Sequence, residues 1–337
     1  MFIQSRNGRK YFLRTAAALS IAALAFTGCS TAGSNDAGAA SDTEAEEEPI
    51  SMTVARGQVN IENSIIAEEQ GIFEDAGIIV DSQVSQGATA TNSAVISGEF
   101  DVALTDAISA TRAISEGMPI EVVAGQKHAD PDHPLESGVL LPPDSPITDW
   151  SDLEGKKVGI PDLGGLPQLT VQEGMAEQGL DPDSVEFVAL PLPSLPEAAA
   201  TGEVDAVFVF SVFYFGAMSQ GFTPLGTGVG EFLPNSPQSV WIASRDYAEN
   251  NTVALDRFRE ALDDSNSVVA EDEDMVRNVY HENTELPADF IDNEMVLAPL
   301  STDLPQDGWE HLIDVMVTHD ELPEALSYDE IVWEGAR

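Results

Sequence analysis

The chain has 337 residues, of which 59 are Asp or Glu and only 14 are Lys or Arg, so its formal net charge is −45. Nucleic-acid binding depends on clustered Lys and Arg, and this balance therefore excludes nucleic acid as a partner. It also argues against docking on anionic lipid through charge. The single cysteine excludes disulfides and cysteine-rich metal sites, and we expect neither a cofactor nor a metal.

Residues 1–28 resemble a bacterial lipoprotein signal peptide. Several basic residues precede an apolar stretch from Ala16 to Phe26, which is too short to span a bilayer. The stretch ends in Phe26-Thr27-Gly28-Cys29, which is similar to a lipobox, where the cysteine receives lipid and becomes the mature N-terminus. We therefore expect a protein that is lipid-anchored through Cys29 on the extracytoplasmic face of the cell membrane. An ordinary signal peptide, in which Cys29 is incidental, is the alternative.

Residues 29–49 are polar and acidic and contain almost no apolar side chains. Such a segment cannot bury enough surface to offset its chain entropy, so it is expected to be a disordered tether. The remainder, from Ile50 to Arg337, is long enough for one large or two medium α/β lobes.

The first part of this remainder alternates between short apolar runs and helical stretches. Strands are predicted at Met52–Ala55, Ile78–Val84, Val102–Thr105 and Ile120–Ala124. Helices are predicted at Ile61–Phe73, Ala88–Ile96 and Ala107–Glu116. This spacing is typical of parallel βαβ units.

The same pattern begins again further along the chain. Strands are predicted at Val158–Ile160, Val185–Leu190 and Ala206–Phe210, and helices at Leu166–Gln178 and Pro196–Thr201. The restart also repeats sequence, because the segment 97–102 (SGEFDV) is answered by the segment 201–206 (TGEVDA). This repeat indicates two lobes built on one plan, with chance similarity of small acidic segments as the alternative.

Two segments are predicted to cross between the lobes. Lys127–Ser137 is rich in Pro, Asp and His, and its prolines favour a hinge loop over a metal site. Ser239–Arg245 is predicted as a returning apolar strand. Lobe 1 is thus expected to comprise residues 50–134 and 243–337, and lobe 2 residues 135–242. Two such hinges leave a cleft that can close on a ligand.

Ligands of open α/β sheets bind beyond the carboxyl ends of the strands, against helix N-termini. The residues at these turns form the candidate ligand-binding set: Arg56, Gln86, Gly87, Ala88, Thr105, Asp106, Gly165, Gln168, Phe210, Ser211, Phe213 and Tyr214. Taken singly, each turn is equally explained by ordinary turn chemistry. Arg56 is suited to pair with an acidic group of the ligand or with an acidic side chain of the protein. The three aromatic residues are suited either to the core or to stacking on a flat ligand.

Three passages are similar to the nitrate, sulfonate, taurine and thiamin-precursor group of ABC solute-binding proteins. They are residues 66–78, residues 97–103, and Asp144–Ile147 together with Asp152–Gly159. The resemblance implies an α/β protein with the two-lobed periplasmic binding protein type II fold. It further implies a monomer that closes over a small molecule and delivers it to ABC permease and ATPase subunits.

The resemblance leaves the ligand and two other classes of function open. Members of the group bind inorganic anions or organic molecules, and the aromatic run Phe208–Phe215 favours a flat organic ligand such as a thiamin precursor, an aromatic acid or a sulfonate. A ligand-binding sensor lipoprotein without transport is one alternative. An enzyme on the same fold, such as a pyrimidine synthase, is another, but those enzymes rely on a cysteine-rich motif that this chain lacks. No catalytic activity is expected.

Overall fold

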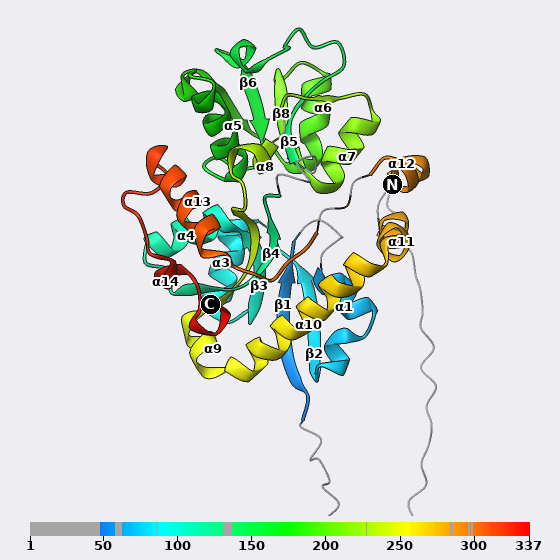
Figure 1. The fold of residues 1–337 in the computed structure, drawn as a ribbon, viewed down its shortest axis with the longest axis vertical. Helices are drawn as coiled ribbons and strands as arrows, with labels where there is room; N and C mark the ends of the chain where they lie inside the picture. The colour runs from blue at the N-terminus through cyan, green and yellow to red at the C-terminus, as the bar shows by residue number, and fades with distance from the viewer. Residues whose placement is uncertain are drawn as a thin grey trace, which may run out of the picture. The chain divides into compact units, whose positions relative to one another are not determined.

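The computed structural model describes residues 48–337, except 58–62, 86, 131–136, 227, 284–285, 296 and 298. The predicted signal segment, Cys29 and the tether up to residue 47 lie outside the described residues. The described chain forms two five-stranded sheets, each with its own helices (Figure 1). This two-lobed α/β arrangement confirms the fold class expected from the sequence.

The first sheet belongs to lobe 1 and has the strand order β2-β1-β3-β10-β4. Its strands are β1 (Ile50–Arg56), β2 (Ile78–Val84), β3 (Val102–Asp106), β4 (Ile120–His128) and β10 (Pro237–Ser244). β1 pairs in parallel with β2 and β3, whereas β10 runs antiparallel between β3 and β4. The central strands are buried along nearly their whole length, which explains why they are continuous apolar runs.

The helices that follow the strands of lobe 1 bury their apolar faces against this sheet. They are α1 (Asn63–Glu69), α2 (Ile72–Asp75), α3 (Ala88–Ser97), α4 (Ala107–Ser115) and α9 (Arg245–Asn250). The long helix α10 (Thr252–Glu271) packs against α1 (Figure 1). On α10, Phe258 stacks on Phe73 and meets the edge of Trp241 in β10, with ring centroids 5.6 Å and 5.2 Å apart. This aromatic cluster joins three parts of the chain into one core.

The second sheet belongs to lobe 2 and has the order β7-β6-β8-β5-β9. Its strands are β5 (Ser137–Leu141), β6 (Lys157–Ile160), β7 (Glu186–Ala189), β8 (Ala206–Phe210) and β9 (Thr223–Pro224). Its helices are α5 (Leu166–Glu177), α6 (Leu195–Ala200), α7 (Ser211–Ser219) and α8 (Gly228–Phe232). β6 pairs in parallel with β7 and β8, and β5 runs antiparallel to β8.

The two sheets repeat one plan. In each, a central strand lies between two parallel partners, and an antiparallel strand follows on one side. The repeated sequence segments contribute equivalent contacts. The carboxylate of Asp101 accepts a hydrogen bond from the backbone N–H of Thr53 at 2.7 Å, and that of Asp205 accepts one from the N–H of Lys157 at 2.9 Å. Each aspartate thus fastens the start of its strand to the neighbouring strand, so the sequence repeat reflects a repeated structural contact.

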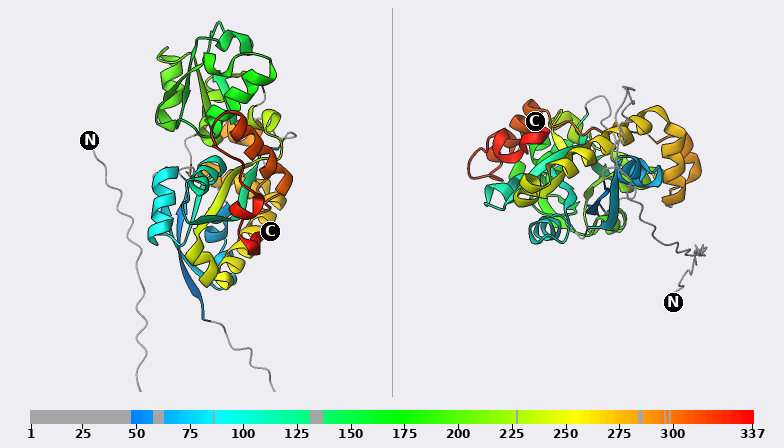
Figure 2. Two further views of the ribbon diagram at one scale, coloured as in Figure 1. Left: turned by 90° about the vertical axis from the view of Figure 1, so that its left-hand side faces the viewer. Right: turned by 90° about the horizontal axis from the view of Figure 1, so that it is seen from below.

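The C-terminal part of the chain is divided between the lobes, whereas the sequence placed all of it in lobe 1. The remaining helices are α11 (Glu273–Asn283), α12 (Ala288–Asn293), α13 (Gln306–Thr318) and α14 (Tyr328–Ile331). Tyr280 and Phe290, from α11 and α12, share an apolar cluster with Phe215 of lobe 2. α13 packs on β10, and the C-terminal helices run along the side of lobe 1 and reach lobe 2 (Figure 2).

The return to lobe 1 also begins earlier than residue 243. β10 starts at Pro237 and pairs with β3 and β4 from there onward, so residues 237–242 lie in the first sheet. None of the helices in the described part of the chain combines the length and the apolar run that a bilayer crossing requires. The proline-rich part of the first crossing, residues 131–136, lies outside the described residues.

Candidate ligand-binding site

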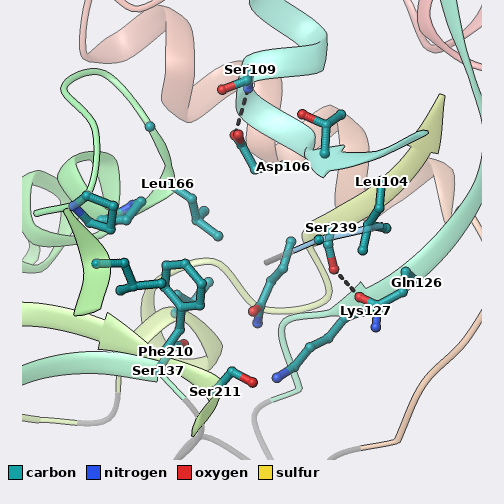
Figure 3. Close-up of a pocket in the computed structure, with 18 of the residues that line it drawn as sticks. Leu104, Asp106, Ser109, Gln126, Lys127, Ser137, Leu166, Phe210, Ser211 and Ser239 are labelled. Atoms are coloured by element: carbon teal, nitrogen blue, oxygen red, sulfur yellow. Dashed lines mark hydrogen bonds between the residues drawn. The ribbon is translucent and has the colours of Figure 1, made fainter. Parts of the chain in front are cut away.

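A cavity of about 610 Å³ is lined by residues of both lobes. Lobe 1 contributes the carboxyl ends of β3 and β4 together with β10, and lobe 2 contributes the end of β8 and the starts of α5 and α7 (Figure 3). This volume is typical of sites for small organic molecules. The position follows from the topology, because the carboxyl ends of parallel strands and the helix N-termini meet there.

The lobe 1 wall is polar and acidic. Asp106 ends β3, and its carboxylate accepts a hydrogen bond from the backbone N–H of Ser109 at 2.8 Å, which caps α4. Burial raises the pKa of Asp106, although the Ser109 hydrogen bond and Arg112 act in the opposite direction. Within the described part of the chain, the hydroxyl of the neighbouring Thr105 is buried and has no hydrogen-bond partner. A buried hydroxyl in this state costs about 1–3 kcal/mol unless a ligand satisfies it.

Lys127 and two polar neighbours line the cavity where β4 lies beside β10. Ser239 faces Lys127 in the strand register, and its hydroxyl donates a hydrogen bond to the side-chain oxygen of Gln126. Lys127 is only partly exposed, and desolvation by the surrounding protein lowers its pKa to about 8. Figure 3 shows its side chain reaching toward Ser211 of lobe 2.

The lobe 2 wall contains two helix starts without side-chain caps. α5 begins after Gly165 and α7 after Phe210, and neither helix has a side-chain hydrogen bond to its first turn. Their first-turn N–H groups therefore favour an oxygen acceptor or an anion. Ser211 has φ = 53°, a left-handed conformation that costs a non-glycine residue about 1–2 kcal/mol. The apolar part of the lining includes Leu104, Leu166 and Phe210.

Two polar contacts join the lobes beside the cavity. The guanidinium of Arg112 in α4 donates to the backbone carbonyl of Gly164 and pairs with the carboxylate of Glu321. Gly164 has φ = 74°, and a Cβ there would lie 3.0 Å from the Arg112 guanidinium, so a side chain is disfavoured at this turn. His319 Nε2 lies 2.6 Å from the Glu173 carboxylate on α5.

The structure places half of the predicted site residues on the cavity. Those that line it are Gly87, Thr105, Asp106, Gly165, Phe210 and Ser211. Gln86 lies outside the described residues, and Ala88 begins α3, but the position of its side chain is not described.

The other predicted residues do not line the cavity. The side-chain oxygen of Gln168 accepts a hydrogen bond from the N–H of Gly164 at 2.9 Å and so holds the turn before α5. Arg56 ends β1 and does not line the cavity. Phe213 packs against the lobe 2 apolar cluster, and Tyr214 is a member of that cluster with 2% of its surface exposed. The α7 positions after Ser211 thus turn toward the core, which removes Tyr214 as a stacking surface.

Several lining residues were missed, above all Lys127, Gln126, Ser239 and Arg112. A signal for the first two was present in the sequence. They follow the apolar run Ile120–Ala124 after one glycine, so the rule applied to the other strand ends would have selected them. The run was taken to end at Ala124, whereas β4 continues to His128.

A two-lobed α/β fold with a cavity between the lobes is the periplasmic binding protein fold. The chain belongs to the NMT1/THI5-like family, because the family described as "NMT1/THI5 like" matches residues 58–274, which is more than half of the chain.

Known proteins of similar sequence or structure agree with this fold. The chain is 22% identical to the "Putative binding protein YtlA" of Bacillus subtilis (strain 168), over 79% of this chain and 82% of that protein. The alkanesulfonate-binding protein SsuA from Xanthomonas axonopodis pv. citri, bound to MOPS, has a TM-score of 0.72 at 16% identity, covering 85% of this chain and 99% of that one. The desulfurization enzyme DSZB has a TM-score of 0.60 at 17% identity, covering 85% and 97% of the two chains.

Proposed function

We propose that this protein is the solute-binding component of an ABC importer, which captures a small organic molecule between its lobes and delivers it to the permease and ATPase subunits. The observation that carries the proposal is the cavity of about 610 Å³ to which both lobes contribute. A ligand that touches both walls stabilises the closed arrangement, and closure around a solute is how two-lobed proteins present cargo. Family membership and the similarity to SsuA support the same class of function.

The lining favours an organic ligand over a small inorganic anion. The apolar side chains of Leu104, Leu166 and Phe210 contribute to the lining alongside the polar residues. An aromatic or heterocyclic body can lie against such side chains, whereas an isolated inorganic anion would leave them without a contact. We propose that the protein acts as a monomer, held at the extracytoplasmic face of the membrane by lipid on Cys29.

The similarity to DSZB keeps the enzyme alternative in view, because the same fold carries a reaction in that protein. The described residues that line this cavity include no cysteine, on which a synthase of the kind considered above would rely, and no histidine. The lining therefore favours binding without chemistry. A sensor lipoprotein would use the same cavity, and detection of ABC permease and ATPase subunits in complex with the loaded protein would favour import.

The test is a thermal-shift screen of the mature protein with four groups of probes: thiamin-precursor pyrimidines, alkanesulfonates, aromatic acids and flavins. A molecule that binds only the folded state must raise the melting temperature. Small-angle scattering with the best probe should then show a more compact protein. Product formation from a bound probe, followed by mass spectrometry, would contradict the binding function and support an enzyme. An absence of binding across all four groups would contradict the proposed solute class.

A further inference from the structure

The C-terminal region is attached to both lobes. α10 packs on lobe 1, but α11 and α12, which follow it, pack on lobe 2. There α12 lies beside α7 (Figure 1), with the ring centroid of Phe290 5.8 Å from that of Phe215. By residue 301 the chain is back on lobe 1, because the backbone N–H of Ser301 donates to the carbonyl of Gln126 in β4 at 3.2 Å. This region therefore contacts both sides of the cavity.

Specific backbone contacts fix both attachments. On the lobe 2 side, the guanidinium of Arg277 in α11 donates to the carbonyls of Ile291 and Met295, which ties α11 to the end of α12. On the lobe 1 side, the N–H of Gly125 in β4 donates to the carbonyl of Thr302 at 2.9 Å. The chain lies so close to β4 here that a Cβ on Gly125 would overlap it. The segment therefore cannot move away from the cavity without breaking contacts with one lobe or the other.

This region contributes an apolar wall to the cavity, which we call the C-terminal wall. Its members are Leu192 of lobe 2 together with Val269, Val276, Leu297 and Leu300. All but Leu300 belong to the apolar cluster of lobe 2 or pack against it. Val276 is almost entirely buried, whereas Leu297 and Leu300 keep part of their surfaces exposed. The two leucines are therefore the part of the wall that a solute can cover.

Most of the C-terminal wall lies beyond the part of the chain that the family model matches. The match ends at residue 274, and Val276, Leu297 and Leu300 follow it. Asp106 and Phe210, on the other walls of the cavity, lie within the match. The C-terminal wall is thus a feature of this chain that the family match does not supply.

We infer that the C-terminal wall sets the length of the solute, by packing Leu297 and Leu300 against an alkyl or aryl extension. Each methylene group that leaves water for an apolar surface favours binding by about fourfold, until the extension meets side chains that have no room to move. The wall side chains carry no hydrogen-bonding group, so they select by size and leave the polar groups of the solute to other residues. This inference rests on the proposed solute-binding function and makes Leu300 a specificity-determining residue.

Isothermal titration of the mature protein with two homologous series tests the wall. One series is the n-alkanesulfonates, and the other is the 2-n-alkyl-4-aminopyrimidines, which carry no acid. In at least one series, affinity should rise by about fourfold per added methylene group up to a longest accepted member, and it should fall for the next member. This length limit is the quantity that the variants should change.

Two substitutions at one position should move the length limit in opposite directions. Leu300→Ala makes room and should extend the limit by about one or two methylene groups, whereas Leu300→Phe should shorten it by a similar amount. Opposite shifts cannot arise from a loss of stability, which the melting temperature of each variant measures separately. Leu180→Ala is the matched control, because Leu180 is also partly buried but does not line the cavity. It should leave the limit unchanged.

An identical length limit in the wild type, Leu300→Ala and Leu300→Phe would overturn the inference and leave the solute-binding function standing. If neither series binds but another molecule of the wider screen does, Leu300→Phe should weaken the binding of that molecule by about tenfold or more. Unchanged affinity in that case would also overturn the inference alone. If no molecule of either series or of the screen binds, both the inference and the proposed function fail.

Discussion

Lys127 lies on β4 opposite Ser239 of β10, where it lines the cavity, and desolvation lowers its pKa to about 8. At neutral pH the ammonium is therefore charged at a position where water solvates it poorly. An acidic ligand group that contacts the ammonium would favour the charged form.

Affinity for an acidic ligand is expected to fall as the pH rises above about 8. Below this value Lys127 is already protonated in the free protein, so binding takes up no proton. Above it, binding must add a proton to the lysine, and the affinity falls by up to about tenfold per pH unit until the pKa of the bound state is reached. Titrations with benzenesulfonate from about pH 7 to about pH 10 measure this slope, because a sulfonate stays ionised throughout that range.

The other ionisable side chains that line the cavity in the described structure are Asp106, Arg112, Asp162 and Tyr280. Burial raises the pKa of Tyr280 and moves its titration further into the alkaline range, and burial also raises the pKa of Asp106. If Lys127 alone carries the pH dependence, the Lys127→Met variant should show a flat profile. A slope that persists in this variant would assign the pH dependence to another group.

Cys29 is expected to determine where the protein resides without affecting what it binds. Replacement by serine removes the thiol that would carry lipid. The Cys29→Ser protein should therefore be absent from the membrane fraction and should not be labelled by radioactive palmitate. Its ligand affinity should equal that of the wild type, because Cys29 precedes β1, the first strand of the described structure, which begins at Ile50. Palmitate labelling that persists in the variant would contradict lipid attachment at this residue.

At the scale of single elements, the sequence repeat indicates the structural contacts of Asp101 and Asp205 most clearly. Asp101 accepts hydrogen bonds from both the backbone N–H and the hydroxyl of Thr53, at 2.7 Å and 2.9 Å, in a partly buried position. Asp205 accepts one backbone hydrogen bond from Lys157 at an exposed position. The two aspartates occupy equivalent places in the two sheets, but Asp101 accepts two hydrogen bonds from its neighbouring strand and Asp205 accepts one.

Asp101→Ala should lower the free energy of unfolding by about 1–3 kcal/mol, because the backbone N–H and the hydroxyl of Thr53 in β1 lose their carboxylate acceptor. Asp205→Ala should cost less, since water replaces its single exposed contact. Chemical denaturation measures both changes. Glu99→Ala is the control, because Glu99 is exposed in the same turn as Asp101. Equal losses from the two aspartates would contradict the difference in burial.

The sequence predicts elements whose burial follows a local period and misses those that depend on a distant partner. Ile78–Val84 and Ala206–Phe210 have the predicted bounds, because their apolar runs end at turn residues. β5 was not predicted, since its position depends on antiparallel pairing with β8, about 70 residues away along the chain. Likewise, the apolar face of α11 shows that the helix is covered, but not that lobe 2 covers it.

The same distinction applies to the residues predicted for the candidate site. Thr105, Asp106 and Ser211 were predicted from a rule of topology that places strand ends at a ligand, and all three line the cavity. Tyr214 was assigned to the ligand as well, but the rotation of α7 about its axis turns this ring into the core. Lys127 was missed because the strand-end rule was not applied after the apolar run that ends at Ala124, although β4 continues to His128. Strand length and helix rotation are properties of the packed structure.

At the scale of the whole molecule, polar contacts between the lobes bear on how tightly the cavity closes. His319, in the segment after α13, meets Glu173 of α5, and both side chains are largely buried, with 6% and 18% of their surfaces exposed. Neither residue lines the cavity. A contact of this kind adds to the stability of the closed arrangement without touching the ligand, so it should affect affinity through the population of that arrangement.

Glu173→Gln tests this coupling, because glutamine keeps the size of the side chain and removes its charge. The closed arrangement loses a charge-assisted contact, so a ligand must contribute more of the closing free energy itself, and affinity should fall about threefold to tenfold. The loss should appear mainly as faster dissociation, measured by stopped flow, and small-angle scattering of the unliganded variant should report a more open protein.

Glu186→Gln on the exposed face of lobe 2 is the control. If the Glu173→Gln protein binds ligand as tightly as the wild type and gives the same scattering, the contact between His319 and Glu173 stabilises the fold but does not control closure. The contact of Arg112 with Gly164 and Glu321 would then be the one that holds the lobes closed.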